Sequence, residues 1–476
     1  MQKTSLFVSN KGAETNKSID AILDAKEKQK QFILSENLWK VMGQLSWAAV
    51  IAMVLYGFNA LLDAFFVGRF VGETALAGVS LAYPITQTSM AVGALIGVGA
   101  GSVLSISLGA KDRDTQRRIL GNVNVMTVLC TVICMAVALM FSKQLIAVMG
   151  GSGEALEIGN SYFRITIYGA VFWIYGLAAN MIIRAEGKMK TAAWMMGAGL
   201  IANAVMNYIF IVLMNMGVEG AAWGTNVGML VYSLLGWVYF GTHKASFETK
   251  VASFKADKEN ISSILRLGMP SLIMSVMSLI QAIVVFNALS KYGTDADIAF
   301  YGVLYRIFQF LLTPIFGLMR SLQPVIGIHY GAKQYDRVIR AYKIFGVAAM
   351  LLTIPFWLAS LIAPQPILGS MLTEQELTDT QIGYFRIYMV ILPALSVIFM
   401  AMTFYPSIDK GKPAAVIGIA RQLLFYVPVM LIVPRFYGVA GIYYGSLAID
   451  VIIVIWTILM VKKEFNLLRR RAELGQ

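Results

Sequence analysis

The chain has 476 residues, of which 58% are hydrophobic and only 14% are charged, and its formal net charge is +13. Soluble globular proteins are usually about 45–50% apolar and about 25% charged, so this composition excludes a water-soluble fold. Apolar runs such as 45–66 and 125–141 come near or exceed the roughly 20 residues that cross a bilayer as a helix, which predicts an all-α integral membrane protein.

Polar breaks divide the sequence into about twelve predicted transmembrane helices. Residues 1–40 are polar and carry no apolar core after their basic residues, so they predict a cytoplasmic N-terminal tail and no cleaved signal peptide. An N-terminal lobe at 41–241 contains helices near 41–67, 75–106, 117–142, 160–183, 190–214 and 219–241. After a polar linker at 242–261, a C-terminal lobe at 262–461 contains helices near 262–290, 297–328, 338–363, 382–406, 413–434 and 440–461, and a cytoplasmic tail follows at 462–476.

The Lys and Arg residues are concentrated in every second loop. Thirty of the 39 lie in the two tails and in the loops near Lys111, Lys188, Lys255, Arg337 and Lys412, whereas the alternate loops and their helix ends hold six. The other three, Arg306, Arg320 and Arg421, fall in or at the edge of helices. Cytoplasmic loops carry such an excess, which predicts a multi-pass protein of the cell (inner or plasma) membrane with both termini in the cytoplasm. The net charge is thereby explained without nucleic acid as a partner.

Other kinds of chemistry find no support in the sequence. Cys130 and Cys134 lie four residues apart in one apolar helix, where buried thiols are expected instead of a disulfide. The histidines, His243 and His329, are not spaced as a metal site, and no Gly-Lys pair continues into the Ser or Thr of a P-loop. The loops are too short for a catalytic domain, so the protein is predicted not to be an enzyme and to need no cofactor.

An internal repeat relates the two lobes. The string Gly-Ala-Lys at 109–111 returns at 331–333, and Tyr-Phe-Arg-Ile at 162–165 returns at 384–387. Both strings recur after the same number of residues, which is the separation of Gly109 and Gly331. This interval is called the repeat displacement below. The glycine pattern at 217–224 returns at 438–445, close to that displacement.

The repeat has consequences for topology. Because each repeat has six spans, the halves must have the same topology and be related by an axis along the membrane normal. The sequence therefore predicts two parallel six-helix repeats around a central cavity, which is the geometry of alternating access.

Three strings resemble the multidrug and toxic compound extrusion (MATE) family of cation-coupled exporters. They are Leu-Asp-Ala-Phe-Phe-Val-Gly at 62–68, Ile-Arg-Ala-Glu-Gly-Lys at 183–188, and Gln-Pro-Val-Ile-Gly at 323–327 running into Tyr-Gly-Ala-Lys at 330–333. The likeness extends over nearly the whole chain except the tails. It implies transport driven by H⁺ or Na⁺ and leaves the substrate open.

Asp63 is a candidate coupling residue because an ionisable group within a membrane helix is costly and usually functional. The alternative is a solvated helix end that pairs with Arg69. In the fifth helix, Asn203 and Asn207 are four residues apart and share one face, which suits either a polar site or interhelical hydrogen bonds. The family resemblance implies a cation site made of Asp63, Asn203, Asn207 and Thr225.

Asn207 departs from the family pattern, which has a second aspartate at this position. One carboxylate supplies a single formal charge, although the amide oxygen of Asn207 can still bind a hard cation such as Na⁺. Burial of a lone carboxyl disfavours its charged form, which suits a group that takes up and releases protons. The sequence favours H⁺ slightly and leaves Na⁺ at this site open.

Polar residues of other helices are candidates for the substrate cavity. Arg421 and Asp450 either pair with each other or line the cavity. Gln281 is the partner of Asn59 at the repeat displacement. The full set is Asn59, Gln281, Asn287, Arg306, Arg421 and Asp450.

The function predicted from the repeat and the resemblance is secondary active multidrug efflux, a route to antibiotic resistance. A monomeric antiporter would export amphipathic small-molecule drugs or organic cations in exchange for H⁺ or Na⁺. The alternative is a lipid-linked glycan flippase or polysaccharide exporter of the same superfamily. That activity would need a larger and more cationic cavity for a pyrophosphate, and few arginines lie within the predicted helices. A purely structural or receptor protein would explain neither the repeat nor Asp63.

Overall fold

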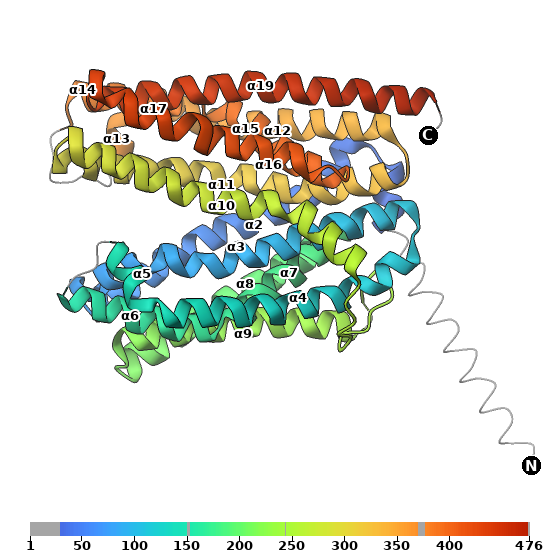
Figure 1. The fold of residues 1–476 in the computed structure, drawn as a ribbon, viewed down its shortest axis with the longest axis horizontal. Coiled ribbons are helices and arrows are strands. Elements are labelled where there is room, and N and C mark those ends of the chain that lie inside the picture. Colours follow the sequence, from blue (N-terminus) through green and yellow to red (C-terminus); the bar gives the residue numbers. More distant parts are fainter. Residues whose placement is uncertain (1–28, 150–152, 243, 370–376, 475–476) are drawn as a thin grey trace, which may run out of the picture.

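The computed structural model describes residues 29–149, 153–242, 244–369 and 377–474. Their regular secondary structure consists of helices and contains no strand, which confirms the all-α prediction. Figure 1 shows long helices lying roughly alongside one another in two groups, with α2 to α9 in one and α10 to α19 in the other. Residues 1–28 of the predicted tail and His243 lie outside the described residues.

A helix forms at each of the six predicted positions of the N-terminal half. Asn37 and Asp112 accept hydrogen bonds from backbone N–H groups of the first turns of α2 and α4, so polar side chains cap both helices. The span predicted at 160–183 is bent by 54° between α6 and α7. The elements are α2 (Leu38–Phe70), α3 (Glu73–Ala110), α4 (Arg113–Met140), α5 (Ser142–Val148), α6 (Gly153–Tyr168), α7 (Ala170–Ala185), α8 (Met189–Asn207), the π-helix η1 (Tyr208–Leu213) and α9 (Gly217–Gly241).

The C-terminal half also has a helix at each predicted position. Its elements are α10 (Lys258–Tyr292), α11 (Asp295–Gly331), α12 (Tyr335–Ile362), α13 (Pro364–Gly369), α14 (Asp379–Met389), α15 (Leu392–Ser407), α16 (Gly411–Ile419), the π-helix η2 (Ala420–Tyr426), α17 (Val427–Ile432), α18 (Pro434–Tyr437) and α19 (Ala440–Glu473). The last helix continues past residue 461 into the segment predicted as a tail. The buried Glu464 of this extension pairs with Lys410 at 2.6 Å, which holds it against the bundle.

Ten helices of the described residues are long and apolar enough to cross a membrane, or eleven if the bent pair α6 and α7 is one span. Of the twelve predicted helices, α9 is the one that does not meet this test. Its 25 residues are sufficient in length, since about 20 residues cross the hydrocarbon core. Its low hydropathy reflects the many glycines and the polar residues Thr225 and Asn226.

The contact between α3 and α11 is symmetric and runs through the repeat glycines. A methyl group placed on Gly109 would lie 2.8 Å from the backbone nitrogen of Ala332, and one on Gly331 would lie 2.8 Å from that of Ala110. Exchanging each residue for its partner at the repeat displacement converts the first contact into the second. The C-terminal ends of both helices meet there, so the helices are parallel and a pseudo-twofold axis runs between them.

Unusual backbone conformations recur at the same displacement. Lys111 and Lys333 both have a positive φ, of 58° and 57°, just after the ends of α3 and α11. Gly187 (φ 80°) and Asp409 (φ 60°) form a second such pair, again at the repeat displacement. Left-handed conformations are uncommon for residues other than glycine, so their recurrence supports the internal duplication independently of the strings.

The linker lies at the end of the bundle where α3 ends and α4 begins, called the linker end below. Asn124 Nδ2 donates to the carbonyls of Val251 and Ser253, and the backbone N–H of Asp257 donates to Asn122. Arg118 pairs with Asp257 at 2.5 Å, and this hydrogen bond is the main reason that the carboxyl pKa of Asp257 lies below its ordinary value. The linker is therefore fastened to α4.

Candidate functional site

Asp63 lies in α2 within a group of amide side chains. Asn207, the last residue of α8, donates from Nδ2 to Asp63 Oδ1 at 2.6 Å. Asn59, one turn earlier in α2, donates to Asp63 Oδ2 at 3.4 Å. Both Asn203 and Asn207 are about 1% exposed, and Asp63 is half-buried. The carboxylate is thus held by hydrogen bonds between α2 and α8 and within α2.

Asn203 completes this group and connects it to α9. In one orientation of its amide, Nδ2 donates to Thr225 Oγ1 at 3.4 Å. In the reversed orientation, the nitrogen donates to Asp63 Oδ1 at 3.0 Å and the oxygen accepts from the Thr225 backbone N–H at 3.2 Å. The reversed orientation satisfies both ends of the amide, so it is the orientation that we assign. The structure therefore brings Asp63, Asn203, Asn207 and Thr225 together and adds Asn59.

Glycines of α9 make room for the two asparagines. A methyl group on Gly228 would lie 2.6 Å from Asn203 Cβ, and one on Gly224 would lie 3.2 Å from the Asn207 backbone nitrogen. Directly after Asn207, the α-helix changes to the π-helix η1, a local distortion that often occurs at functional sites. The site therefore depends on close packing of α8 against α9, which sequence reasoning did not identify.

This arrangement can bind a proton or a small hard cation. Asp63 supplies the negative charge, while amides and a hydroxyl surround it. The buried Asn207 Oδ1 has no hydrogen-bond partner among the described residues, and it would reach a cation beside Asp63 only after the amide turns, because Nδ2 faces the carboxylate. Within the same residues, no group of three or more His, Cys, Asp or Glu residues could hold a metal ion. The donor set fits Na⁺ only through amide oxygens and one carboxylate.

A second polar site lies in the C-terminal half, around a cavity of about 110 Å³. Arg421 Nε donates to Asp450 Oδ1 at 2.8 Å, and both side chains are largely buried. Both residues also line the cavity, together with Gln281 and the aromatic side chains of Tyr305, Phe308 and Tyr388. The pairing and the cavity position predicted as alternatives for Arg421 and Asp450 thus occur together, and the ion pair neutralises the arginine.

The three other predicted cavity residues lie outside this cavity. Asn287 is exposed and donates to the carbonyl of Ile283 in its own helix. Arg306 is exposed as well and does not line the cavity. Asn59, predicted for the cavity, contacts Asp63 instead. Its position four residues before Asp63 on α2 was a sequence signal for this contact.

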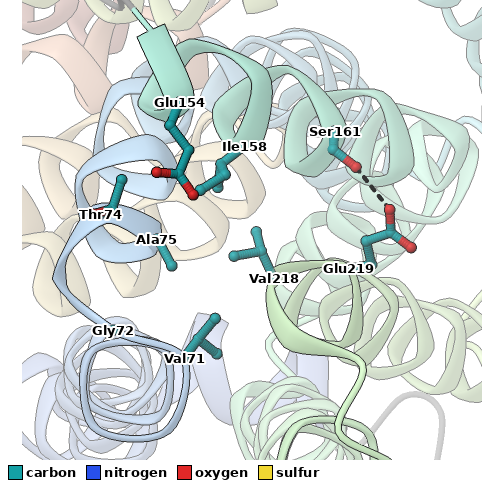
Figure 2. A pocket seen from close by; sticks show the side chains of 9 residues that line it. All are labelled: Val71, Gly72, Thr74, Ala75, Glu154, Ile158, Ser161, Val218 and Glu219. Carbon is teal, nitrogen blue, oxygen red and sulfur yellow. Dashed lines mark hydrogen bonds between the residues drawn. The ribbon is translucent and has the colours of Figure 1, made fainter.

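A larger pocket, of about 430 Å³, opens at the end of the N-terminal half opposite the linker end. Figure 2 shows it between the turn after α2 and the starts of α6 and α9, with the carboxylates of Glu154 and Glu219 on its wall. Ser161 donates to Glu219 at 3.1 Å. The pocket shares no lining residue with the Asp63 group, so its size alone does not make it the functional site.

Comparison with known proteins gives consistent matches. The MatE family model matches residues 48–209 and 270–432, one stretch in each half. The multidrug export protein MepA of Staphylococcus aureus (strain MSSA476) is 24% identical over 436 residues, covering 92% of this chain and 96% of that protein. MepA of Staphylococcus haemolyticus (strain JCSC1435) is 24% identical over 427 residues, covering 90% and 94%. A solved outward-facing conformation of a multidrug resistance MATE family transporter of the MOP superfamily has a TM-score of 0.87 at 24% identity, covering 93% and 98%.

Proposed function

The chain belongs to the MatE family, and on this premise we propose that it is a secondary transporter that exports amphipathic organic compounds in exchange for H⁺ or Na⁺. The carrying observation is the Asp63 carboxylate, held in a membrane helix by amides of α2 and α8. The relatives named multidrug export proteins support the substrate class. The charge asymmetry between loops supports cytoplasmic termini in the cell membrane, and nothing in the proposal requires more than one copy of the chain.

We favour the proton as the coupling ion. In the structure an amide nitrogen of Asn207 points at Asp63, so binding Na⁺ would require this amide to turn its oxygen toward the ion. Protonation of Asp63 requires no surrounding oxygen ligands, because it removes the negative charge that the amide donors stabilise. Either ion would weaken the hydrogen bonds between α2 and α8. If this packing differs between inward-facing and outward-facing states, ion binding shifts their equilibrium by its differential affinity.

The alternative activity, a lipid-linked glycan flippase, receives less support from the C-terminal cavity. A pyrophosphate would need uncompensated positive charge, whereas Arg421 is neutralised by Asp450. The cavity, at about 110 Å³, is also small for a lipid-linked glycan. Multidrug export is therefore the activity that the observations favour.

The Asp63→Asn variant tests the coupling role, because the amide keeps the size of the side chain but cannot titrate. We expect the protein to fold and insert normally and to lose efflux driven by an imposed pH or Na⁺ gradient in proteoliposomes. Asp114→Asn, which alters an exposed carboxylate, is the matched control and should transport like the wild type. Gradient-driven efflux at the wild-type rate in Asp63→Asn would place the coupling site elsewhere. Efflux in the control that follows only a Na⁺ gradient would exclude the proton.

A further inference from the structure

A buried guanidinium group in the N-terminal half has no acidic partner among the residues that the structure describes. Arg184, near the C-terminal end of α7, is 0% exposed, and its Nε donates to Asn180 Oδ1 at 2.6 Å. Its Nη1 and Nη2 have no hydrogen-bond partner among the described residues. A buried charge is costly unless it is paired and hydrogen-bonded. The two free donors of Arg184 therefore point to a ligand that the described residues do not supply.

A second guanidinium reaches the same place from the other half of the protein. Arg320 of α11 has its Nη1 3.1 Å from the sulfur of Met181 in α7. Helical side chains lean toward the N-terminus of their helix, and the bond to Asn180 shows that the Arg184 guanidinium does so, which brings it to the level of Met181. Both guanidinium groups therefore contact the segment of α7 from Asn180 to Arg184. Neither forms an ion pair within the described ranges.

Tyr232 of α9 adds a hydroxyl that has no hydrogen-bond partner among the described residues. Its side chain is 5% exposed, and its hydroxyl makes no hydrogen bond to any described residue. Close helix packing fixes the ring, because a methyl group on Gly176 of α7 would lie 2.7 Å from its Cδ1. Gly176 lies about one helical turn before Asn180, so the ring packs next to the segment of α7 that the two guanidinium groups contact. Side chains of three helices thus meet along one segment of α7, and the donors of Arg184 Nη1, Arg184 Nη2 and the Tyr232 hydroxyl are unused among the described residues.

We propose that Arg184, Arg320 and Tyr232 form a binding site for an oxyanion, the carboxylate or phosphate of an amphipathic substrate. Guanidinium groups bind such planar or tetrahedral oxyanions through paired hydrogen bonds, and a phenol can donate a third. The inference rests on the proposed export function and narrows its substrates to anionic or zwitterionic compounds.

The position of this site also connects it to transport. Arg320 belongs to the C-terminal half, while Arg184 and Tyr232 belong to the N-terminal half, so a bound oxyanion would bridge the two. Arg320 is half-buried, whereas Arg184 is fully buried. The site shares no residue with the Asp63 group. Separation of the halves at this level would divide the donors and release the anion.

The test compares two dyes with the same xanthene ring system, one with a free carboxylate and one in which this group is an ethyl ester and carries no negative charge. Binding to the purified full-length protein in lipid nanodiscs is measured by fluorescence anisotropy, with inorganic pyrophosphate as a competitor. The wild type should bind the acid about tenfold more tightly than the ester or better, the effect of a charge-assisted hydrogen bond. Arg320→Gln and Tyr232→Phe should reduce this preference, and Arg184→Lys should weaken acid binding while retaining the charge.

The matched control is Arg164→Gln, which removes an exposed guanidinium of α6 and should keep the wild-type preference. The wild type could bind both dyes equally while pyrophosphate still competes with them. If this competition is lost in Arg320→Gln, the result would support the oxyanion site and assign it to phosphate. Equal binding without competition would overturn the proposal. If cells export the ester and the purified protein binds the acid no more tightly than the ester, only the oxyanion site is refuted. If the protein binds the acid selectively but cells export neither dye, only the proposed export function is refuted.

Discussion

Replacing Gly109 with alanine places a methyl group in the contact between the C-terminal ends of α3 and α11. The new carbon would lie 2.9 Å from Gly331 Cα and 2.8 Å from the Ala332 nitrogen, whereas ordinary contacts are 3.4–4 Å. These neighbours are backbone atoms, so the strain is relieved only if the two helices move apart. Overpacking of this kind typically costs about 1–3 kcal/mol. The arrangement with the linker end closed should therefore lose about 5–150-fold in population relative to one with this end open.

Pulsed electron paramagnetic resonance can measure this shift. Spin labels at the exposed positions Arg113 and Arg340, near the starts of α4 and α12, report the separation of the halves at the linker end. In Gly109→Ala, the longer-distance population should increase. Gly331→Ala should have the same effect, because its methyl group would meet the Ala110 nitrogen at 2.8 Å and the Ile106 carbonyl carbon at 2.9 Å. The double variant should be less than additive, since both methyl groups strain one contact.

Gly302→Ala is the matched control within α11. A methyl group there meets nothing within 4 Å, so this variant gains the same helix propensity without a clash. It should leave the distance distribution unchanged. If Gly109→Ala and Gly331→Ala behave like Gly302→Ala, the contact between α3 and α11 does not control the opening of this end, and the argument from close packing is refuted.

Three further predictions concern charge and topology. Asp450→Asn should markedly lower the thermal stability of the detergent-solubilised protein, because removing one partner of a buried ion pair typically costs about 3–5 kcal/mol. Adding Arg421→Met should recover much of this loss. No recovery would argue against the Arg421–Asp450 pair. Burial raises the pKa of the Glu186 carboxyl above its ordinary value of 4.5, so the folded protein keeps this proton to higher pH than the unfolded chain does. The folding stability should therefore fall as the pH rises above 4.5. Glu186→Gln should flatten this pH dependence in melting curves, and an unchanged slope would contradict the role of Glu186. In a variant whose two native cysteines are changed to alanine, a cysteine in place of Lys111 or Lys333 should not be labelled by an impermeant maleimide added outside intact cells. Labelling would show that the topology is the reverse of the one predicted.

The helix positions and the parallel repeat could be predicted because the bilayer restricts the choices. A chain crossing lipid must satisfy its backbone polar groups internally, so apolar runs between polar breaks become helices. The strings around Gly109 and Gly331 indicated the repeat, and the contact between these residues is the one that a parallel pair requires. The helix α9 is the instructive case, since its glycines lower its hydropathy while allowing close approach to Asn203 and Asn207.

The candidate site could be predicted only in part. The four-residue spacing of Asn203 and Asn207 places both amides on one face, but no local pattern shows that this face meets Asp63, which lies far earlier in the chain. The family resemblance supplied that association. The charge pattern assigns Arg184 to the loop near Lys188, because the residues that follow Arg184 in the string at 183–188 end in polar residues. The structure instead places it within α7 and fully buries it, since packing of neighbouring helices is not encoded in hydropathy.

Duplication has left the two halves with unlike chemistry, and this difference assigns them different roles. Val285, which is buried, occupies the position equivalent to Asp63 at the repeat displacement. The Arg421–Asp450 pair neutralises itself, so of these two polar sites only the one around Asp63 has an unbalanced negative charge. Nearer the linker end, α2 also packs on the other half, where a methyl group on Gly317 of α11 would lie 2.6 Å from Val50 Cα. Because one continuous helix carries both features, we expect a change in charge at Asp63 that alters the packing of α2 on α8 to affect the contact between the halves as well.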